Sequence, residues 1–232
     1  MNSTKLRPGM LSSAVIRNSE SRNPLKNAVA DFIDNLSQQY DAVSTLHSTI
    51  DPEMTRTGHA LKVKSTVTRA MEINGKKALR LLEQLHDHER NLHLKAHEKA
   101  GLLKPMQEAH LSELRSALRQ MTLKEREKAI SQAFESGDIA VIRAVQEASS
   151  PVLVGSHTLP IPKLLESFVK QCNPELERDL SEVAELYNRL DLVSDSFAQS
   201  INAFRNEDLE RRAEINKQLT ADALAKLDPL IR

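Results

Sequence analysis

The apolar residues toward the end of the chain repeat in steps of four and three, and this rhythm constrains the fold more than any other feature of the sequence. Residues spaced in this way line one side of an α-helix and form a heptad seam. The seam is interrupted only at Ser194. It consists of Leu176, Leu180, Val183, Tyr187, Leu190, Phe197, Ile201 and Phe204.

Leu209, Ile215 and Leu219 extend the same helix with a shifted face, so the helix is expected to cover residues 174–219. About 46 residues at 1.5 Å each make a rod of about 69 Å, which is longer than a small globule is wide. An amphipathic rod of this length must lie along an equally long partner. The partner is another long helix of the chain, a second copy of the rod, or another protein.

A similar rhythm predicts a first helix over residues 24–50, interrupted at Gln39. Asn23 can cap the free amides at its start, and Pro24 is well tolerated at the first helical position. The apolar positions of this helix are Leu25, Val29, Phe32, Leu36, Val43, Leu46 and Ile50.

Asp51 and Pro52 repeat the start signal and predict a second long helix over residues 52–100. Gly101 stands where a helix ends in a left-handed conformation. With the turn between the two helices, residues 23–104 are expected to form a long helical hairpin.

Residues 105–172 change in character and predict a cluster of short helices. Thr122 and Glu125 have the spacing of a capping box, in which each satisfies an amide of the other. Gly137 has the place of a helix end, and Asp138 has the place of the next cap.

The two ends of the chain complete the predicted organisation. Residues 1–22 are rich in Ser, Asn and Arg and show no apolar period, which predicts a tail that is disordered or ordered only by a partner. Residues 173–232 are expected to contain the long helix and then a short terminal helix, capped by Thr220 and ended near Pro229.

Composition favours helix packing throughout. The 232-residue chain has 3% aromatic residues, no tryptophan and only 6 glycines, so it lacks the bulky and turn-forming residues of sandwiches, barrels and doubly wound sheets. We therefore predict an all-α fold. It should contain long antiparallel or coiled-coil-like helices at about 24–50, 52–100 and 174–219, with a central cluster of short helices.

The formal charge is balanced at +0 overall, but it is not balanced locally. Basic residues outnumber acidic ones over residues 51–105, and the opposite holds over residues 174–232. Opposite local charge favours packing of these two regions side by side. The basic stretch from Lys62 to Arg80 has no aromatic residues interleaved for base stacking, so nucleic acid ranks below protein as a partner.

Cys172 is the only cysteine, which rules out a disulfide within the chain and fits a reducing compartment such as the cytoplasm, or a virion. Its apolar neighbours predict a small buried side chain. The sequence has no run of about 18 apolar residues, so no membrane span is predicted.

Glu89, His93 and His97 are spaced four apart and therefore lie on one face of a predicted helix. This geometry can contribute metal ligands if a second helix adds more. The surrounding sequence is highly polar and favours a solvated surface, so these residues are only weak metal candidates. Sequence motifs for phosphate-binding loops, nucleophilic serines and redox dithiols are missing. The sequence therefore predicts no catalytic residues, no cofactor and no enzyme.

An apolar triplet, Val152 to Val154, begins the predicted loop over residues 151–162. Such a triplet in a loop either covers the edge of a core or docks on a partner. The residues predicted to contact a partner are Val152, Leu153, Val154, Tyr187, Phe197 and Phe204.

The stretch from Leu111 to Gly155 reads LSELRSALRQMTLKEREKAISQAFESGDIAVIRAVQEASSPVLVG. It resembles a segment of uncharacterised helical proteins encoded among the structural genes of tailed phages and prophages. The shared features are LRxALRxM, a short capped helix, a turn at Gly137 and Asp138, an IxRAV helix and a proline-led apolar loop. The resemblance implies a virion component or assembly factor without catalysis, and it implies no site residues.

Three functional hypotheses follow. The first is a structural or assembly protein, in a phage virion by the resemblance, that forms homo-oligomers and attaches to other structural proteins. The second is a monomeric helical adaptor that binds a partner through the 151–162 loop. The third, which is less favoured, is a metal-dependent helical-bundle enzyme using Glu89, His93 and His97.

Overall fold

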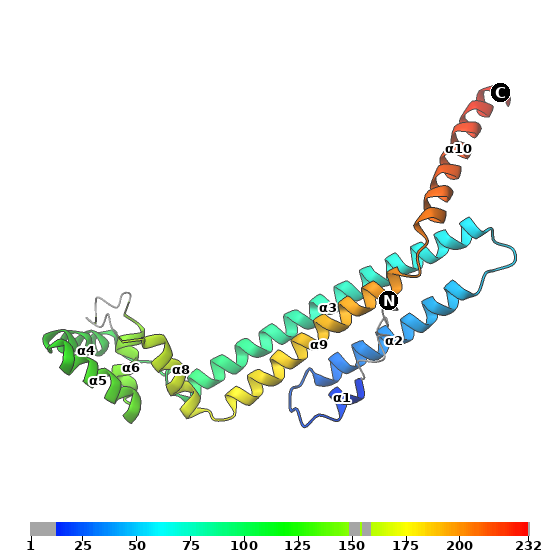
Figure 1. Cartoon of the computed structure of the whole chain (residues 1–232). Helices are drawn as coiled ribbons and strands as arrows, with labels where there is room; N and C mark the ends of the chain where they lie inside the picture. Colours follow the sequence, from blue (N-terminus) through cyan, green and yellow to red (C-terminus); the bar gives the residue numbers. More distant parts are fainter. Residues whose placement is uncertain (1–12, 149–153, 155–158, 232) are drawn as a thin grey trace. The chain divides into compact units, whose positions relative to one another are not determined.

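A computed structural model describes residues 13–148, 154 and 159–231, and within these residues the chain is helical and contains no strand. The predicted all-α fold is thereby confirmed (Figure 1). The helices are α1 (Ser13–Arg17), α2 (Lys26–Ser48), α3 (Arg56–Lys99), α4 (Glu108–Gln120), α5 (Leu123–Ser136), α6 (Ile139–Gln146), α8 (Ile161–Cys172), α9 (Leu176–Asn202) and α10 (Glu207–Ile231).

The chain divides into two compact units. Unit 1 takes the residues up to His86 and those from Glu182 onward, and unit 2 takes residues 87–181. The divisions fall inside α3 and α9, whereas the sequence predicts domain boundaries near residues 104 and 172. The reason is that the last turns of α3 pack with the short helices, because Ala96 and Ala100 belong to their hydrophobic core.

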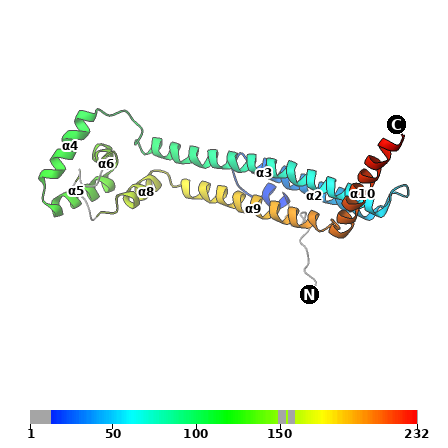
Figure 2. The same cartoon turned by 90° about the horizontal axis from the view of Figure 1, so that it is seen from above.

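Unit 1 is a bundle in which α2, α3 and α9 lie side by side (Figures 1 and 2). The buried side of α9 is wider than the predicted seam, since it includes Leu186 and Val193 beside Leu190 and Phe197. A helix that packs against two neighbours needs a broader apolar face than a two-helix coiled coil does. The α9 helix therefore fills the bundle core rather than pairing along one seam.

A pair of amides explains the polar interruption in the first helix. The side chain of Asn74 in α3 donates from Nδ2 to Oε1 of Gln39 in α2 over 2.7 Å, and Asn74 is buried. A second bond runs from Gln39 Nε2 to Asn74 Oδ1 over 3.3 Å. Because buried amides must be satisfied, this pair favours one register of α2 against α3.

Part of the stretch 1–22, which was predicted to be disordered or ordered only by a partner, packs against the chain itself, while residues 1–12 lie outside the described part of the chain. Residues 13–17 form α1, and Ile16 is buried. Arg17 forms ion pairs with Asp31 and Asp34 of α2, at 2.5 and 2.8 Å. One buried apolar side chain and two ion pairs hold α1 in place. A search for apolar periodicity does not detect such a segment, because these contacts are with residues distant in the sequence.

The predicted rod over residues 174–219 is also wrong, because the helix breaks at residues 203–206. The α9 helix ends at Asn202, and Asn206 accepts a hydrogen bond from the backbone N–H of Leu209 over 3.1 Å, which caps α10. Thr220 does not begin a separate helix. Its hydroxyl donates to the carbonyl of Asn216 over 2.8 Å, within α10.

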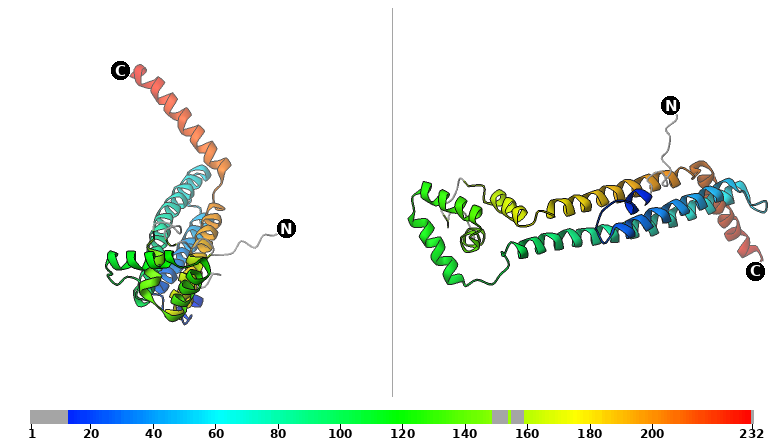
Figure 3. Two further views of the ribbon diagram at one scale, coloured as in Figure 1. Left: turned by 90° about the vertical axis from the view of Figure 1, so that its left-hand side faces the viewer. Right: turned by 90° about the horizontal axis from the view of Figure 1, so that it is seen from below.

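Unit 2 contains the predicted short helices, drawn in green in Figure 3. The Thr122 capping box is present, with the Thr122 N–H donating to Glu125 over 3.0 Å. Gly137 ends α5 at φ +74°, and Asp138 caps α6. The core includes the edge-to-face rings of Phe134 and Phe168, 6.2 Å apart.

The bundle core gives a direct test of the role of Phe197, which is 2% exposed. Phe197→Ala should lower the free energy of unfolding by about 3–5 kcal/mol, because it leaves a cavity in the core. Leu192→Ala on the exposed side of the same helix, where Leu192 is 53% exposed, should change it by less than about 0.5 kcal/mol. Urea unfolding followed by circular dichroism measures both. Equal effects would contradict the packing described for α9.

Candidate protein-interaction site

The apolar loop triplet is only partly described. Val154 is 1% exposed and belongs to the core of unit 2, while Val152 and Leu153 lie outside the described residues. The sequence left two roles open for this loop, covering the edge of a core or docking on a partner, and Val154 covers the core. Its side chain is not available on the surface for a partner.

The aromatic residues predicted to contact a partner lie within the bundle of unit 1. Phe197 is buried, and the half-buried Tyr187 donates its hydroxyl to the carbonyl of Leu82 over 3.4 Å. Phe204 is half-buried, with its ring 5.3 Å from that of Tyr40 and 5.2 Å from that of His47. These side chains therefore bind α9 and the segment after it to the other helices of the bundle.

The histidine-rich segment does not assemble a metal site. His93 is exposed, whereas Glu89 and His97 are half-buried. Burial lowers the pKa of His97, and the neighbouring charge of His93 lowers it further. Within the described part of the chain, no three His, Cys, Asp or Glu side chains are arranged to hold a metal ion. The structure thus offers no support for a metal-dependent enzyme.

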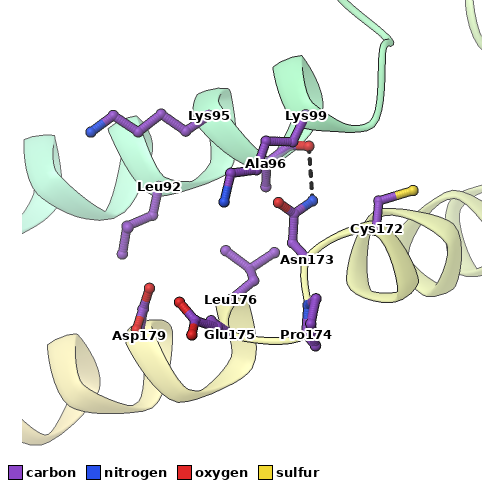
Figure 4. Close-up of a pocket in the computed structure, with 10 residues that line it drawn as sticks. All are labelled: Leu92, Lys95, Ala96, Lys99, Cys172, Asn173, Pro174, Glu175, Leu176 and Asp179. Carbon is purple, nitrogen blue, oxygen red and sulfur yellow. Dashed lines mark hydrogen bonds between the residues drawn. The ribbon is translucent and has the colours of Figure 1, made fainter.

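A cleft of about 470 Å³ lies in unit 2 between the end of α3 and the turn from α8 to α9 (Figure 4). It is lined by Leu92, Lys95, Ala96, Lys99, Cys172, Asn173, Pro174, Glu175, Leu176 and Asp179. The amide of Asn173 donates to the carbonyls of Ala96 and Val169, both over 3.0 Å. Because both amide hydrogens bond backbone, this side chain joins α3 to the turn and has no donor left for a ligand.

Cys172 is exposed at the edge of this cleft, which corrects the prediction of a buried side chain. The apolar residues near it in the sequence, Phe168 and Val169, point into the core. Cys172 is the last residue of α8, at the start of the turn to α9, and its side chain faces solvent there. The thiol therefore has no structural role in packing.

The middle of the C-terminal helix α10 is exposed on all sides and carries apolar residues. From Glu214 to Lys226, a stretch called here the open segment, every side chain of α10 is exposed. Ile215, Leu219 and Leu224 are exposed by 52, 61 and 59%. Isolated helices of fewer than about 12 to 15 residues are marginal in water, and most helices in proteins are stabilised by packing of an apolar face. Ile215 and Leu219 lie on one side of the open segment and Leu224 lies on the other, and the described part of the chain leaves all three largely uncovered.

A cluster of charges holds the base of α10 against the bundle. Arg205 donates from Nη2 to Oε2 of Glu210 over 2.6 Å, and Lys64 of α3 lies 4.0 Å from the same carboxylate. Lys64 also pairs with Glu214. Glu210 is buried, and the hydrogen bond from Arg205, helped by the two positive charges, lowers the pKa of its carboxyl. Through Lys64, the basic region 51–105 contacts the acidic region 174–232, as the local charges predict.

A second exposed apolar line runs along α3 in unit 1. Met71 and Leu79 are exposed, and Gly75 lies midway between them with open space where a Cβ would stand. Lys76 and Arg80 are exposed beside this line. The line is short and flanked by basic side chains, and it ranks below the open segment as an interaction surface.

Sequence reasoning missed the open segment because it joined Ile215 and Leu219 to the preceding helix. A signal was present in the shift of the apolar face after Phe204. Asn206, followed by the acidic residues Glu207 and Asp208, is a typical helix start. A shifted face together with a cap indicates a new helix with a different direction.

In the described ranges, no helix combines the length and the apolar character needed to cross a membrane. No known protein family, curated protein or solved structure matches this chain.

The charge cluster at the base of α10 predicts a pH-dependent anchor. The pKa of Glu210 is lower in the folded than in the unfolded chain, so its stabilising effect is present above the ordinary glutamate pKa and is lost as the pH falls through the lowered value. Glu210→Gln should lower the free energy that holds the first turns of α10 against the bundle by about 2 kcal/mol at neutral pH, because it removes a hydrogen bond to a charged group.

Hydrogen exchange of the amides in residues 207–213 measures this anchor. In the unmodified chain their protection should fall on acidification, and in Glu210→Gln it should be low already at neutral pH. Lys217→Gln, which also removes one charge but on the exposed part of α10, is the control and should leave the protection unchanged. Equal protection in the two variants would show that Glu210 does not anchor the helix.

Proposed function

We propose that this protein is a non-enzymatic helical assembly protein, which forms homo-oligomers and attaches to other structural proteins of a larger particle. The observation that carries the proposal is the open segment of α10, a helix whose apolar side chains Ile215, Leu219 and Leu224 have no partner within the described chain. Exposed apolar side chains on a well-formed helix are typical of a surface that another helix covers.

The way α10 is attached supports this function. Glu210, Arg205 and Lys64 hold the base of the helix, so the direction of the open segment is set by the bundle rather than left to a flexible linker. A helix presented in a fixed direction loses less freedom on binding than a disordered tail does. Unit 1 therefore serves as a support that presents α10 to a partner.

A phage virion is the setting we propose for this assembly role. Support comes from the resemblance of residues 111–155 to proteins of tailed-phage and prophage structural genes. The matched features fall on α4 to α6, including the capped α5, the turn at Gly137 and Asp138, and the helix that contains Arg143. The protein would then act in the virion or, before assembly, in the cytoplasm.

The adaptor hypothesis has less support than assembly. It needs an accessible apolar loop at residues 152–154, and Val154 is buried in the core of unit 2. The open segment, in contrast, is accessible over its whole length. We therefore base the proposed function on α10.

Light scattering after size-exclusion chromatography tests the assembly function. The full chain should give a mass above that of one 26.0 kDa chain, rising with concentration and unaffected by a chelator. The double variant Ile215→Glu with Leu219→Glu should return the mass to that of a monomer, because it places charges in the apolar contact.

Leu192→Glu is the matched control, since Leu192 is an equally exposed leucine of unit 1 that lies outside α10. Its mass should stay that of the unmodified chain. A full chain that remains monomeric at every concentration would overturn self-assembly. An oligomer that survives the double variant would assign assembly to another surface.

A further inference from the structure

The α10 helix carries a second regularity in addition to its exposed apolar residues. Every position of one line along it, in alternating steps of four and three, is exposed. This line, called here the α10 seam, has the spacing of the contact positions in a two-stranded coiled coil. It consists of Asp208, Arg212, Ile215, Leu219, Asp222 and Lys226.

The α10 seam lies away from the side of the helix that contacts the bundle. Glu210 and Ala213 are the buried residues of α10, and Leu209 is half-buried. At 100° per residue Glu210 falls on the opposite side of the helix from Leu219, and Ala213 lies about a third of a turn from Leu219, whereas Leu209 lies on the flank next to Arg212. The contact that anchors α10 therefore leaves its seam accessible.

The order of residues along the seam is complementary to its own reverse. When two copies of α10 are aligned antiparallel about the midpoint between Ile215 and Leu219, these two residues face each other across the axis. In the same alignment Arg212 faces Asp222. One step further out, Asp208 faces Lys226. Antiparallel coiled coils pair their contact positions in this crosswise manner, so apolar meets apolar and each charge meets its opposite.

A parallel, in-register pairing gives the reverse result. Arg212 would then face Arg212 of the second chain, and Asp222 would face Asp222. Like charges opposite one another in a seam cost free energy, and polar residues at such positions select orientation and register. The charge order thus discriminates between the two orientations.

None of the charged residues of the seam is used elsewhere within the described chain. The ion pairs of α10 with the rest of unit 1 involve Glu210 and Glu214, both outside the seam. Asp208, Arg212, Asp222 and Lys226 make no ion pair with the residues that the structure describes. Their charges are therefore available to a second molecule.

We propose that the partner of α10 is the α10 helix of a second copy of this chain, packed antiparallel across a twofold axis near residue 217. This inference rests on the proposed assembly function and specifies its geometry. Because the interface is isologous, each contact between Arg212 and Asp222 and between Asp208 and Lys226 occurs twice. Ile215 and Leu219 form the apolar centre between them.

Charge-reversal variants of the full chain test this geometry. Arg212→Asp places a carboxylate opposite Asp222, and Asp222→Arg places a guanidinium opposite Arg212. Each variant should weaken self-association by on the order of tenfold or more, because two attractive pairs become repulsive. Lys217→Asp changes the charge by the same amount as Arg212→Asp outside the seam, and it should leave association unchanged.

Mixing the two weakened variants provides the decisive measurement. In a mixed pair, the new carboxylate at position 212 faces the new guanidinium at position 222, and the other two seam positions keep their natural charges. Sedimentation or light scattering should therefore show that the mixture associates about as strongly as the unmodified chain, although neither variant alone does so.

The outcomes separate this inference from the assembly function. An oligomer that forms equally well in both single variants would overturn antiparallel α10 pairing and leave assembly in place. Loss of association in both variants without recovery in the mixture would also overturn the pairing. A monomeric unmodified chain would overturn the assembly function and, with it, this inference.

Discussion

The buried carboxylate of Glu210 is the interaction on which the arrangement of the C-terminal helix depends. A buried charge without a partner costs several kcal/mol, so its cationic neighbours must be in place when this part of the chain folds. Arg205 lies in the connection between α9 and α10, and Lys64 lies on α3. One carboxylate thus ties the connection, the bundle and the first turns of α10 together. With this side of α10 held inward, helix geometry directs the seam outward.

A polar residue inside an apolar seam fixes the register of two helices in unit 1. Gln39 interrupts the seam of α2 and is matched by Asn74 on α3. An apolar seam tolerates shifts of register, whereas a buried polar group has a partner in only one register. The amide pair therefore adds specificity to the bundle at some cost in stability. In the proposed dimer, Arg212 and Asp222 would do the same between two chains.

Local signals explain what the sequence predicts well. The capping box at Thr122, the left-handed Gly137 and the short helices around them depend on neighbouring residues, and they are present as expected. The break at residues 203–206 is hidden in the sequence, because the apolar rhythm of α9 reaches Phe204 and the local signal of a new helix is the cap at Asn206. The packing of α1 through Ile16 and the exposure of Cys172 depend on residues distant in the sequence. The exposed seam could be found only once the direction of α10 was known.

The composition of the α10 seam fits a contact that depends on concentration and becomes strong where many copies are brought together. Its apolar centre, Ile215 and Leu219, is far smaller than the interface of a stable dimer, and its outer positions are charged. Charged positions keep α10 hydrated while it is unpaired, which limits association with unrelated apolar surfaces. Weak pairwise contacts become strong when copies are held on one particle, because the effective concentration rises without any new contact. A seam that is selective in orientation and weak in isolation therefore suits a protein that assembles on a larger structure.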